Sequence, residues 1–327
     1  MNSSIFRCFL LIAITTSSFA FGQVSPSDST ASSRLPARKL AEGILTVVPP
    51  DQDFADTSIG PLDLDLVEKH PELAWTAPDF PDNKPFFGSP AETLLELSKT
   101  ITFRRDVWSL QIAFKPVRLI EVDVRNAAGQ LERKVVWYMV YRVHYPGLDV
   151  LPVADPESNI ASDPQSGARE SVRFLPRFSI VSKERNLMID ARILPTAKAA
   201  IEAKERVGQP LLDSIEIAKI DIPYSADGSK GVWGLATWTD VDPRLDFFAV
   251  DIRGLTNAYR IKTDAASAKQ YERKTLRIFH WRAGDAIDEV KDRIRLGIPA
   301  SESPERVQHY LDKFSLQERL DYQWIYR

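Results

Sequence analysis

From residue 107 onward, apolar and polar residues alternate in short runs, a spacing of two that is typical of β-strands with one buried face. The clearest runs lie at 107–115 and 117–124. The run at 134–145 is almost continuously β-branched, aromatic or apolar, which is typical of a strand covered on both faces. We expect 117–124 and 134–145 to form a hairpin, because the turn-forming stretch 126–129 lies between them.

Strands are predicted through most of the remaining chain, and helices are few. The same criteria predict strands at 172–174, 178–182, 187–193, 214–222, 232–239, 247–252, 259–263, 274–281 and 320–326. Capping residues, apolar stripes and terminal Gly or Pro predict helices at 90–99, 197–207, 285–296 and 304–314. A proline-containing loop is expected over 146–169.

This order of elements favours a mainly β fold. We expect an antiparallel β-sandwich of the Ig-like type, present once or as two related sandwiches, with a few peripheral helices. Strands and helices do not alternate regularly, which argues against α/β enzyme folds. The length suggests about two domains, with β-rich domains expected at 61–160 and 168–327 after a flexible, irregular segment at 23–60.

The first residues predict export. Arg7 precedes a short apolar run, and Ala20-Phe21-Gly22 places small residues where a signal peptidase needs them, so 1–22 is expected to be a signal peptide cleaved before Gln23. The expected location is periplasmic or extracellular, with no transmembrane segment after cleavage. The only cysteine, Cys8, lies inside this signal, which excludes disulfides, thiolate metal sites and cysteine nucleophiles from the exported chain.

The charge composition argues against nucleic acid as a partner. There are 42 Lys and Arg against 45 Asp and Glu, a formal net charge of −3, so the chain lacks the positive excess that nucleic-acid binding requires. A nucleophile elbow, a dinucleotide or phosphate-binding glycine loop and a His-Glu-x-x-His motif are all missing from the sequence. No cofactor is expected apart from a calcium ion, and catalytic residues cannot be assigned.

The calcium hypothesis rests on the acidic segment 239–246. Asp240, Asp242 and Asp246 offer the hard oxygen ligands that Ca²⁺ prefers, and the first two would point the same way in an extended chain. The alternative is that these residues form an ordinary strand-to-turn exit, where Asp-Pro is favoured by local hydrogen bonding.

A second hypothesis concerns aromatic residues on the strongest predicted strand. Trp137, Tyr141 and Tyr145 share one face, and exposed rings there would stack on a sugar or on an extended peptide. The alternative is that the rings pack in the core.

Several stretches resemble a set of uncharacterised exported proteins from planctomycete-type bacteria. The resemblance is carried by 137–143, 236–248, 254–260 and the ending 321–327, and it covers most of the chain after about residue 90. It implies export and a lineage, and it brings no activity and no functional residue.

These observations lead to three functional hypotheses. The first is a non-catalytic exported β-sandwich that binds a protein or carbohydrate of the cell envelope. The second is a hydrolase of envelope polysaccharide or peptide, with carboxylates or histidines brought together from distant strands. The third is a calcium-dependent adhesion module built around the aspartates of 240–246.

Overall fold

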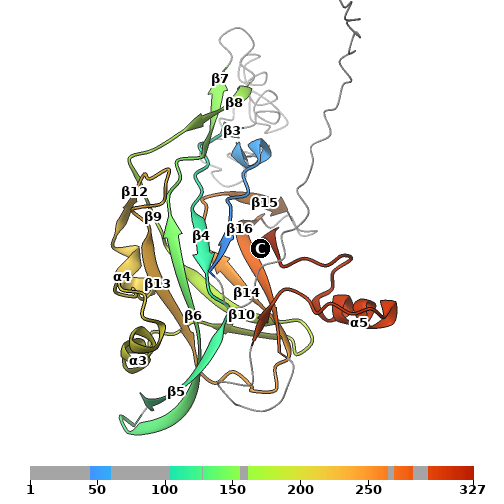
Figure 1. Ribbon diagram of the computed structural model, residues 1–327. Coiled ribbons are helices and arrows are strands. Elements are labelled where there is room, and N and C mark those ends of the chain that lie inside the picture. The colour runs from blue at the N-terminus through green and yellow to red at the C-terminus, as the bar shows by residue number, and fades with distance from the viewer. Residues whose placement is uncertain (1–44, 60–102, 127, 155–160, 264–268, 283–293) are drawn as a thin grey trace, which may run out of the picture. The chain divides into compact units, whose positions relative to one another are not determined.

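The first of two main sheets is built around β6 (Leu131–His144), the longest strand (Figure 1). On one edge, β6 pairs with β13 (Val232–Trp238) over seven residues. Its other edge pairs with β5 (Arg118–Arg125) and then with β4 (Gln111–Phe114), and β4 pairs in turn with β1 (Thr46–Val48). All of these pairings are antiparallel, so one long strand holds the sheet together.

The computed structural model describes residues 45–59, 103–126, 128–154, 161–263, 269–282 and 294–327, which all belong to the unit Ala37–Arg327. The expected signal peptide and the expected helix at 90–99 lie outside the described residues, as does most of the expected helix at 285–296. Among the helices that the structure describes, none is long and apolar enough to span a membrane.

The second main sheet is centred on β14 and β16. Its strands are β11 (Leu187–Asp190), β10 (Arg177–Ser182), β14 (Phe247–Arg253), β16 (Lys269–Trp281) and β15 (Tyr259–Thr263), with β17 (Arg295–Leu296) and β18 (Tyr322–Tyr326) paired to β16. The strand pairs are again antiparallel.

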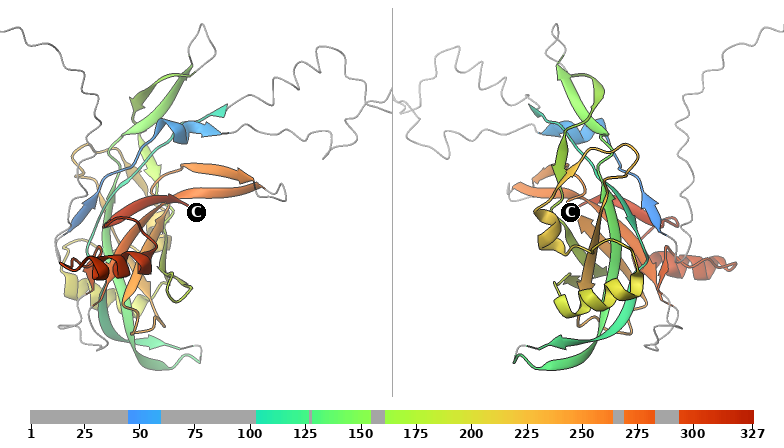
Figure 2. Two further views of the ribbon diagram at one scale, coloured as in Figure 1. Left: turned by 90° about the vertical axis from the view of Figure 1, so that its right-hand side faces the viewer. Right: turned by 60° about the vertical axis from the view of Figure 1, so that its left-hand side comes forward.

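The two sheets face each other across the main core, which confirms the predicted sandwich. Alternate residues of β6 and β13 share this core with residues of β10, β14 and β16. The outer face of the first sheet is covered by α3 (Pro195–Glu205), and that of the second by α5 (Pro304–Phe314). Figures 1 and 2 show these two helices on opposite sides of the paired sheets.

Short elements complete the described fold. They are η1 (Phe54–Thr57), the strand pair β2 (Ser58–Ile59) with β3 (Phe103–Arg104), the hairpin of β7 (Asp149–Ala154) with β8 (Ala161–Gly167), the pair β9 (Ser171–Arg173) with β12 (Asp221–Pro223), and α4 (Ser214–Ala218).

Several expected elements are confirmed, and two differ. The hairpin of β5 with β6, the helices α3 and α5 and the final strand β18 form as predicted. The expected strand 214–222 is wrong at its start, because Asp213 and Glu216 form a capping box that initiates α4. The expected loop 146–169 contains the β7–β8 hairpin.

Pairing crosses the expected domain boundary. β6 lies in the range expected as the first domain and β13 in the range expected as the second, yet they are hydrogen-bonded neighbours in one sheet. The main core also mixes residues from both ranges, such as Trp137 and Phe248. The two ranges therefore build one sandwich together in the part of the chain that the structure describes.

Candidate functional site

The aromatic strip predicted as a ligand platform is buried. Trp137 and Tyr141 of β6, and Tyr145 directly after it, do lie on one side, but that side faces the core, and their exposed fractions are 1%, 0% and 0%. The Trp137 ring meets Phe248 edge-on at 5.3 Å, and the Tyr141 ring lies 4.6 Å from that of Phe178. The platform hypothesis is therefore wrong, because the second sheet packs against this face across the main core.

Two of the three aspartates predicted as calcium ligands, Asp240 and Asp242, pair with basic side chains instead. Lys134 Nζ lies 3.1 Å from Asp240 Oδ1, and this contact lowers the pKa of Asp240. Asp242 accepts a hydrogen bond from its own turn, at the backbone N–H of Arg244, and pairs with Arg185; both contacts lower its pKa.

The third predicted ligand, Asp246, does not join the other two in a cluster of ligands. Among the described residues, no group of three His, Cys, Asp or Glu side chains is arranged to hold a metal ion. The segment 239–246 therefore matches the alternative of a strand-to-turn exit, with its carboxylates at 240 and 242 neutralised by arginine and lysine.

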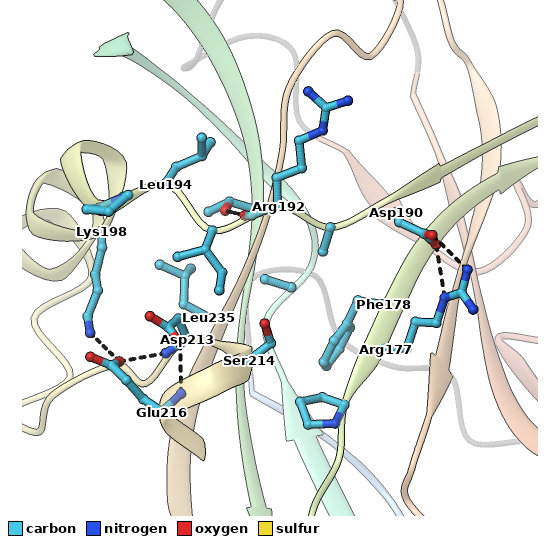
Figure 3. Close-up of a pocket in the computed structure, with 16 residues that line it drawn as sticks. Arg177, Phe178, Asp190, Arg192, Leu194, Lys198, Asp213, Ser214, Glu216 and Leu235 are labelled. Atoms are coloured by element: carbon cyan, nitrogen blue, oxygen red, sulfur yellow. Dashed lines mark hydrogen bonds and ion pairs between the residues drawn. The ribbon is translucent and has the colours of Figure 1, made fainter. Parts of the chain in front are cut away.

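A cleft of about 410 Å³ lies at the outer edge of β13, the edge that does not pair with β6 (Figure 3). Four stretches of the chain line it: 176–178 at the start of β10, 190–195 together with Lys198 of α3, Asp213, Ser214 and Glu216 at the start of α4, and 235–237 of β13. We call it the α3/β13 cleft. Its volume lies within the range of about 300–1,000 Å³ that is typical of ligand pockets.

Ion pairs form two opposite walls of the α3/β13 cleft (Figure 3). On the helical side, Lys198 Nζ lies 2.5 Å from Glu216 Oε2, which also accepts a hydrogen bond from the Asp213 backbone N–H at 2.9 Å. On the strand side, Arg177 Nη2 lies 2.8 Å from Asp190 Oδ2. Lys198 lowers the pKa of Glu216, and Arg177 lowers that of Asp190, so both carboxylates stay ionised at neutral pH.

The rest of the lining is largely apolar. Phe178 and Leu235 are buried beneath the cleft, whereas Ile193 is 38% exposed at its surface. Ser214 is half-exposed, and the Thr237 hydroxyl donates a hydrogen bond to the Arg192 carbonyl. Histidine and cysteine are absent from the described residues that line the cleft.

The outer edge of β13 is paired at two points that flank the cleft. Leu212 forms a parallel bridge with Gly234: its N–H donates to the Trp233 carbonyl at 3.0 Å, and its carbonyl accepts from the Leu235 N–H at 2.9 Å. Farther along, the Arg192 N–H donates to the Thr237 carbonyl at 2.8 Å. The strand edge between these two contacts faces the cleft.

No family model matches this chain, and no curated protein or solved structure shows significant similarity to it. Sequence reasoning missed the α3/β13 cleft, although the Asp-x-x-Glu capping signature at 213–216 is a readable sign of the α4 start that forms one wall.

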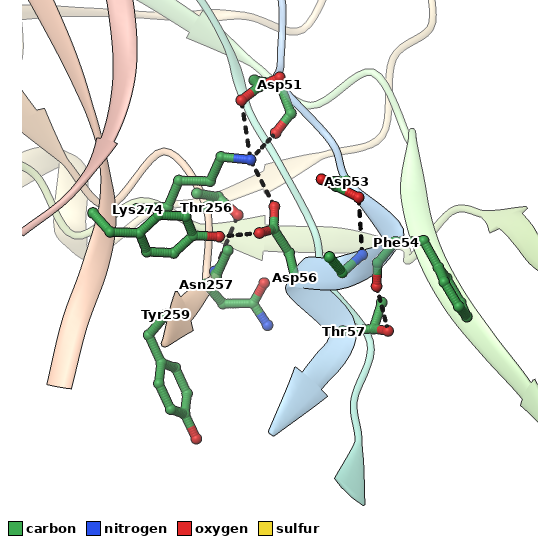
Figure 4. Close-up of polar contacts among 12 residues, drawn as sticks. Asp51, Asp53, Phe54, Asp56, Thr57, Thr256, Asn257, Tyr259 and Lys274 are labelled. Carbon is green, nitrogen blue, oxygen red and sulfur yellow. Dashed lines mark hydrogen bonds and ion pairs between the residues drawn. The ribbon is translucent and has the colours of Figure 1, made fainter. Parts of the chain in front are cut away.

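A second polar cluster joins the N-terminal part of the described chain to the second sheet (Figure 4). Lys274 Nζ on β16 lies 2.6 Å from Asp56 Oδ2 of η1 and 2.8 Å from the Asp51 carbonyl oxygen, and Tyr326 of β18 donates a hydrogen bond to Asp56. Lys274 and Asp56 are both buried, and burial raises the pKa of Asp56. The contacts hold η1 against the sandwich, which is a structural role.

Proposed function

We propose that this protein is an exported, non-catalytic β-sandwich binding module of the cell envelope, and that the α3/β13 cleft is its ligand site. The observation that carries the proposal is that the carboxylates lining the cleft already have partners within the protein. Its carboxylates are already engaged in ion pairs and helix caps, while an apolar floor and a strand edge are left for a ligand. Such a surface can bind and orient a molecule without transferring protons to it.

The chemistry of the carboxyl groups favours binding over hydrolysis. A glycosidase needs two carboxyl groups about 5–10 Å apart, one of them with a raised pKa that lets it act as the acid. Burial raises the pKa of Asp56 and Asp149, but neither lines the cleft. Asp56 is held by Lys274, and the Asp149 carboxylate is buried beside Arg169 Nε at 3.4 Å.

Two substitutions on one helix provide a matched test. Ser214 is the first residue of α4 and lines the cleft, whereas Ile215 follows it, is 56% exposed and does not line the cleft. S214W places an indole in the cleft, and I215W places the same indole on the outside. The pair therefore separates blocking of the cleft from the general effect of a tryptophan on α4.

The purified protein is presented to two probe sets: a phage-displayed library of random linear heptapeptides and an array of bacterial cell-wall glycan fragments. We expect members of at least one set to bind the wild type and I215W, and to lose at least about tenfold in affinity for S214W. We also expect the bound probe to be recovered chemically intact. The proposal is overturned if neither set binds, if S214W binds as the wild type does, or if the probe is cleaved.

A further inference from the structure

The outer edge of β13 leaves one position of an existing ladder unfilled, between the contacts of Leu212 and Arg192. Leu212 runs parallel to β13 and occupies the position opposite Gly234. The next position in the same direction lies opposite Ala236, and the chain does not fill it, because Asp213 turns away to cap α4. The β13 groups that serve this position are the Leu235 carbonyl and the Thr237 N–H, since N–H and C=O groups of alternate residues point to the same edge.

These two backbone groups lack a partner among the residues that the structure describes. The Leu235 N–H bonds to Leu212 and the Thr237 carbonyl bonds to Arg192, which leaves the Leu235 carbonyl and the Thr237 N–H between those two contacts. Both residues line the α3/β13 cleft. An unpaired stretch of strand edge is a template for another extended chain.

The arrangement of the Leu235 carbonyl and the Thr237 N–H along the strand favours a peptide as the ligand. In a parallel ladder, one residue of the added strand donates its N–H to one carbonyl and accepts at its own carbonyl from the N–H two residues farther along, as Leu212 already does at Gly234. The N–H and C=O of that residue belong to two different amides and point the same way. The acetamido group of an amino sugar has a single planar trans amide whose N–H and C=O point in opposite directions, so it cannot satisfy both groups.

We infer that the α3/β13 cleft binds an extended peptide segment of another protein, one residue of which pairs in parallel register with β13 opposite Ala236, between the contacts of Leu212 and Arg192. This inference rests on the proposed binding function and names its ligand class. The residue opposite Ala236 directs its side chain to the core-facing side of the first sheet, where Ala236 shares the core with Phe178 of the second sheet, and its two neighbours direct theirs toward α3. Backbone hydrogen bonds would supply affinity, and the protein surfaces on these two sides of the sheet would select the peptide side chains.

The charges in the lining do not select a charged peptide. Three basic and three acidic side chains contribute to it: Arg177, Arg192, Lys198, Asp190, Asp213 and Glu216. Because the lining is balanced and most of these charges are already paired, we expect the dissociation constant to change less than about threefold when the salt concentration is raised from about 0.05 to 0.5 M.

The test uses a heptapeptide selected from the phage library and resynthesised with a single N-methyl group at each position in turn. N-methylation removes one N–H donor. We expect a loss of at least about tenfold in affinity at one position, where the Leu235 carbonyl loses its partner, and less than about threefold at the two adjacent positions, whose N–H groups point away from β13. Binding to S214W should fall by at least tenfold and binding to I215W should not, with I193W as a second blocking variant if S214W does not fold.

The outcomes separate this inference from the proposed function. If peptides bind in the cleft and no N-methyl position matters by more than about threefold, strand addition is refuted and the binding function stands. If only glycan fragments bind in a way that S214W blocks, the peptide ligand is refuted and the binding function again stands. If no probe depends on the cleft, both are refuted.

Discussion

Replacement of Glu205 should be among the most damaging single changes to this fold. Glu205 is the last residue of α3, and its side chain is 1% exposed. Its carboxylate accepts hydrogen bonds from Lys115 Nζ at 2.6 Å, Arg118 Nη1 at 3.0 Å and the Tyr138 hydroxyl at 2.8 Å. These contacts fasten α3, which carries one wall of the α3/β13 cleft, to β5 and β6.

The magnitude follows from what each substitution leaves behind. E205A leaves the buried Tyr138 hydroxyl without a partner, while Lys115 and Arg118 are 23% and 38% exposed and can reach water. Removing one member of a buried ion pair costs about 3–5 kcal/mol, so we expect E205A to lower the free energy of unfolding by about 4 kcal/mol. E205Q keeps the hydrogen bond from Tyr138 and should cost about 2 kcal/mol.

The dependence on pH gives a second, independent readout. Burial alone would raise the pKa of Glu205, but the hydrogen bonds from Lys115 and Tyr138 and the charge of Arg118 outweigh it, so the pKa in the folded state lies below the ordinary value. The unfolded chain therefore binds a proton first as the pH falls below about 4.5, and the stability that Glu205 contributes is present above that pH and lost below it. E205Q should lack this part of the acid destabilisation.

Urea unfolding followed by tryptophan fluorescence measures these values, with binding of the selected heptapeptide as a second readout. An E205A cost below about 1 kcal/mol, or equal costs for E205A and E205Q, would refute the assignment of Glu205 as the anchor of α3. So would a wild-type acid profile that E205Q does not change.

Three further changes test other parts of the fold. K274M should lower the free energy of unfolding, measured in urea, by about 3–5 kcal/mol, because it leaves the buried Asp56 carboxylate without its cation. The double variant K274M/D56L should regain part of that stability. A double variant no more stable than K274M would contradict the pairing. Burial lowers the pKa of His280 in the folded state to about 3, so between about pH 6.5 and 3 only the unfolded state binds a proton at this side chain. Stability therefore decreases as the pH is lowered through this range, by up to about 1.4 kcal/mol per pH unit. H280F should make the thermal stability less dependent on pH in this range, and an unchanged pH dependence would contradict the assignment. G234A would place a Cβ into the Tyr141 ring and should cost about 1–3 kcal/mol, whereas a neutral effect would show that the ring is free to move.

The sheet elements were largely predictable from the sequence because alternation with a period of two is a local signal. It placed β5, β6, β13, β14 and β18 close to their observed bounds. Alternation also showed that Trp137 and Tyr141 share a face. It could not show which layer that face meets, since the face is covered by β10 and β14 of the second sheet, and these strands lie far from β6 in the sequence.

The candidate site was harder to predict for a different reason. The α3/β13 cleft combines four separate stretches of the chain, and no periodicity links them. Its most specific feature is the Leu235 carbonyl together with the Thr237 N–H. Because almost every residue type has these backbone groups, the amino-acid sequence does not reveal them. At 214–222, the apolar residues Ile215 and Ile217 alternate as in a strand, but the capping box of Asp213 and Glu216 initiates a helix there.

Amide hydrogen exchange at Thr237, followed by NMR on the isotope-labelled protein, tests the central claim most directly. With the selected heptapeptide at saturation, the Thr237 N–H should exchange at least about tenfold more slowly than in the free protein, because it then donates a hydrogen bond to a carbonyl of the peptide. The Arg192 N–H, which already donates to the Thr237 carbonyl, is the internal control and should change little. An exchange rate at Thr237 that saturating peptide leaves unchanged would contradict the addition of a strand at this edge.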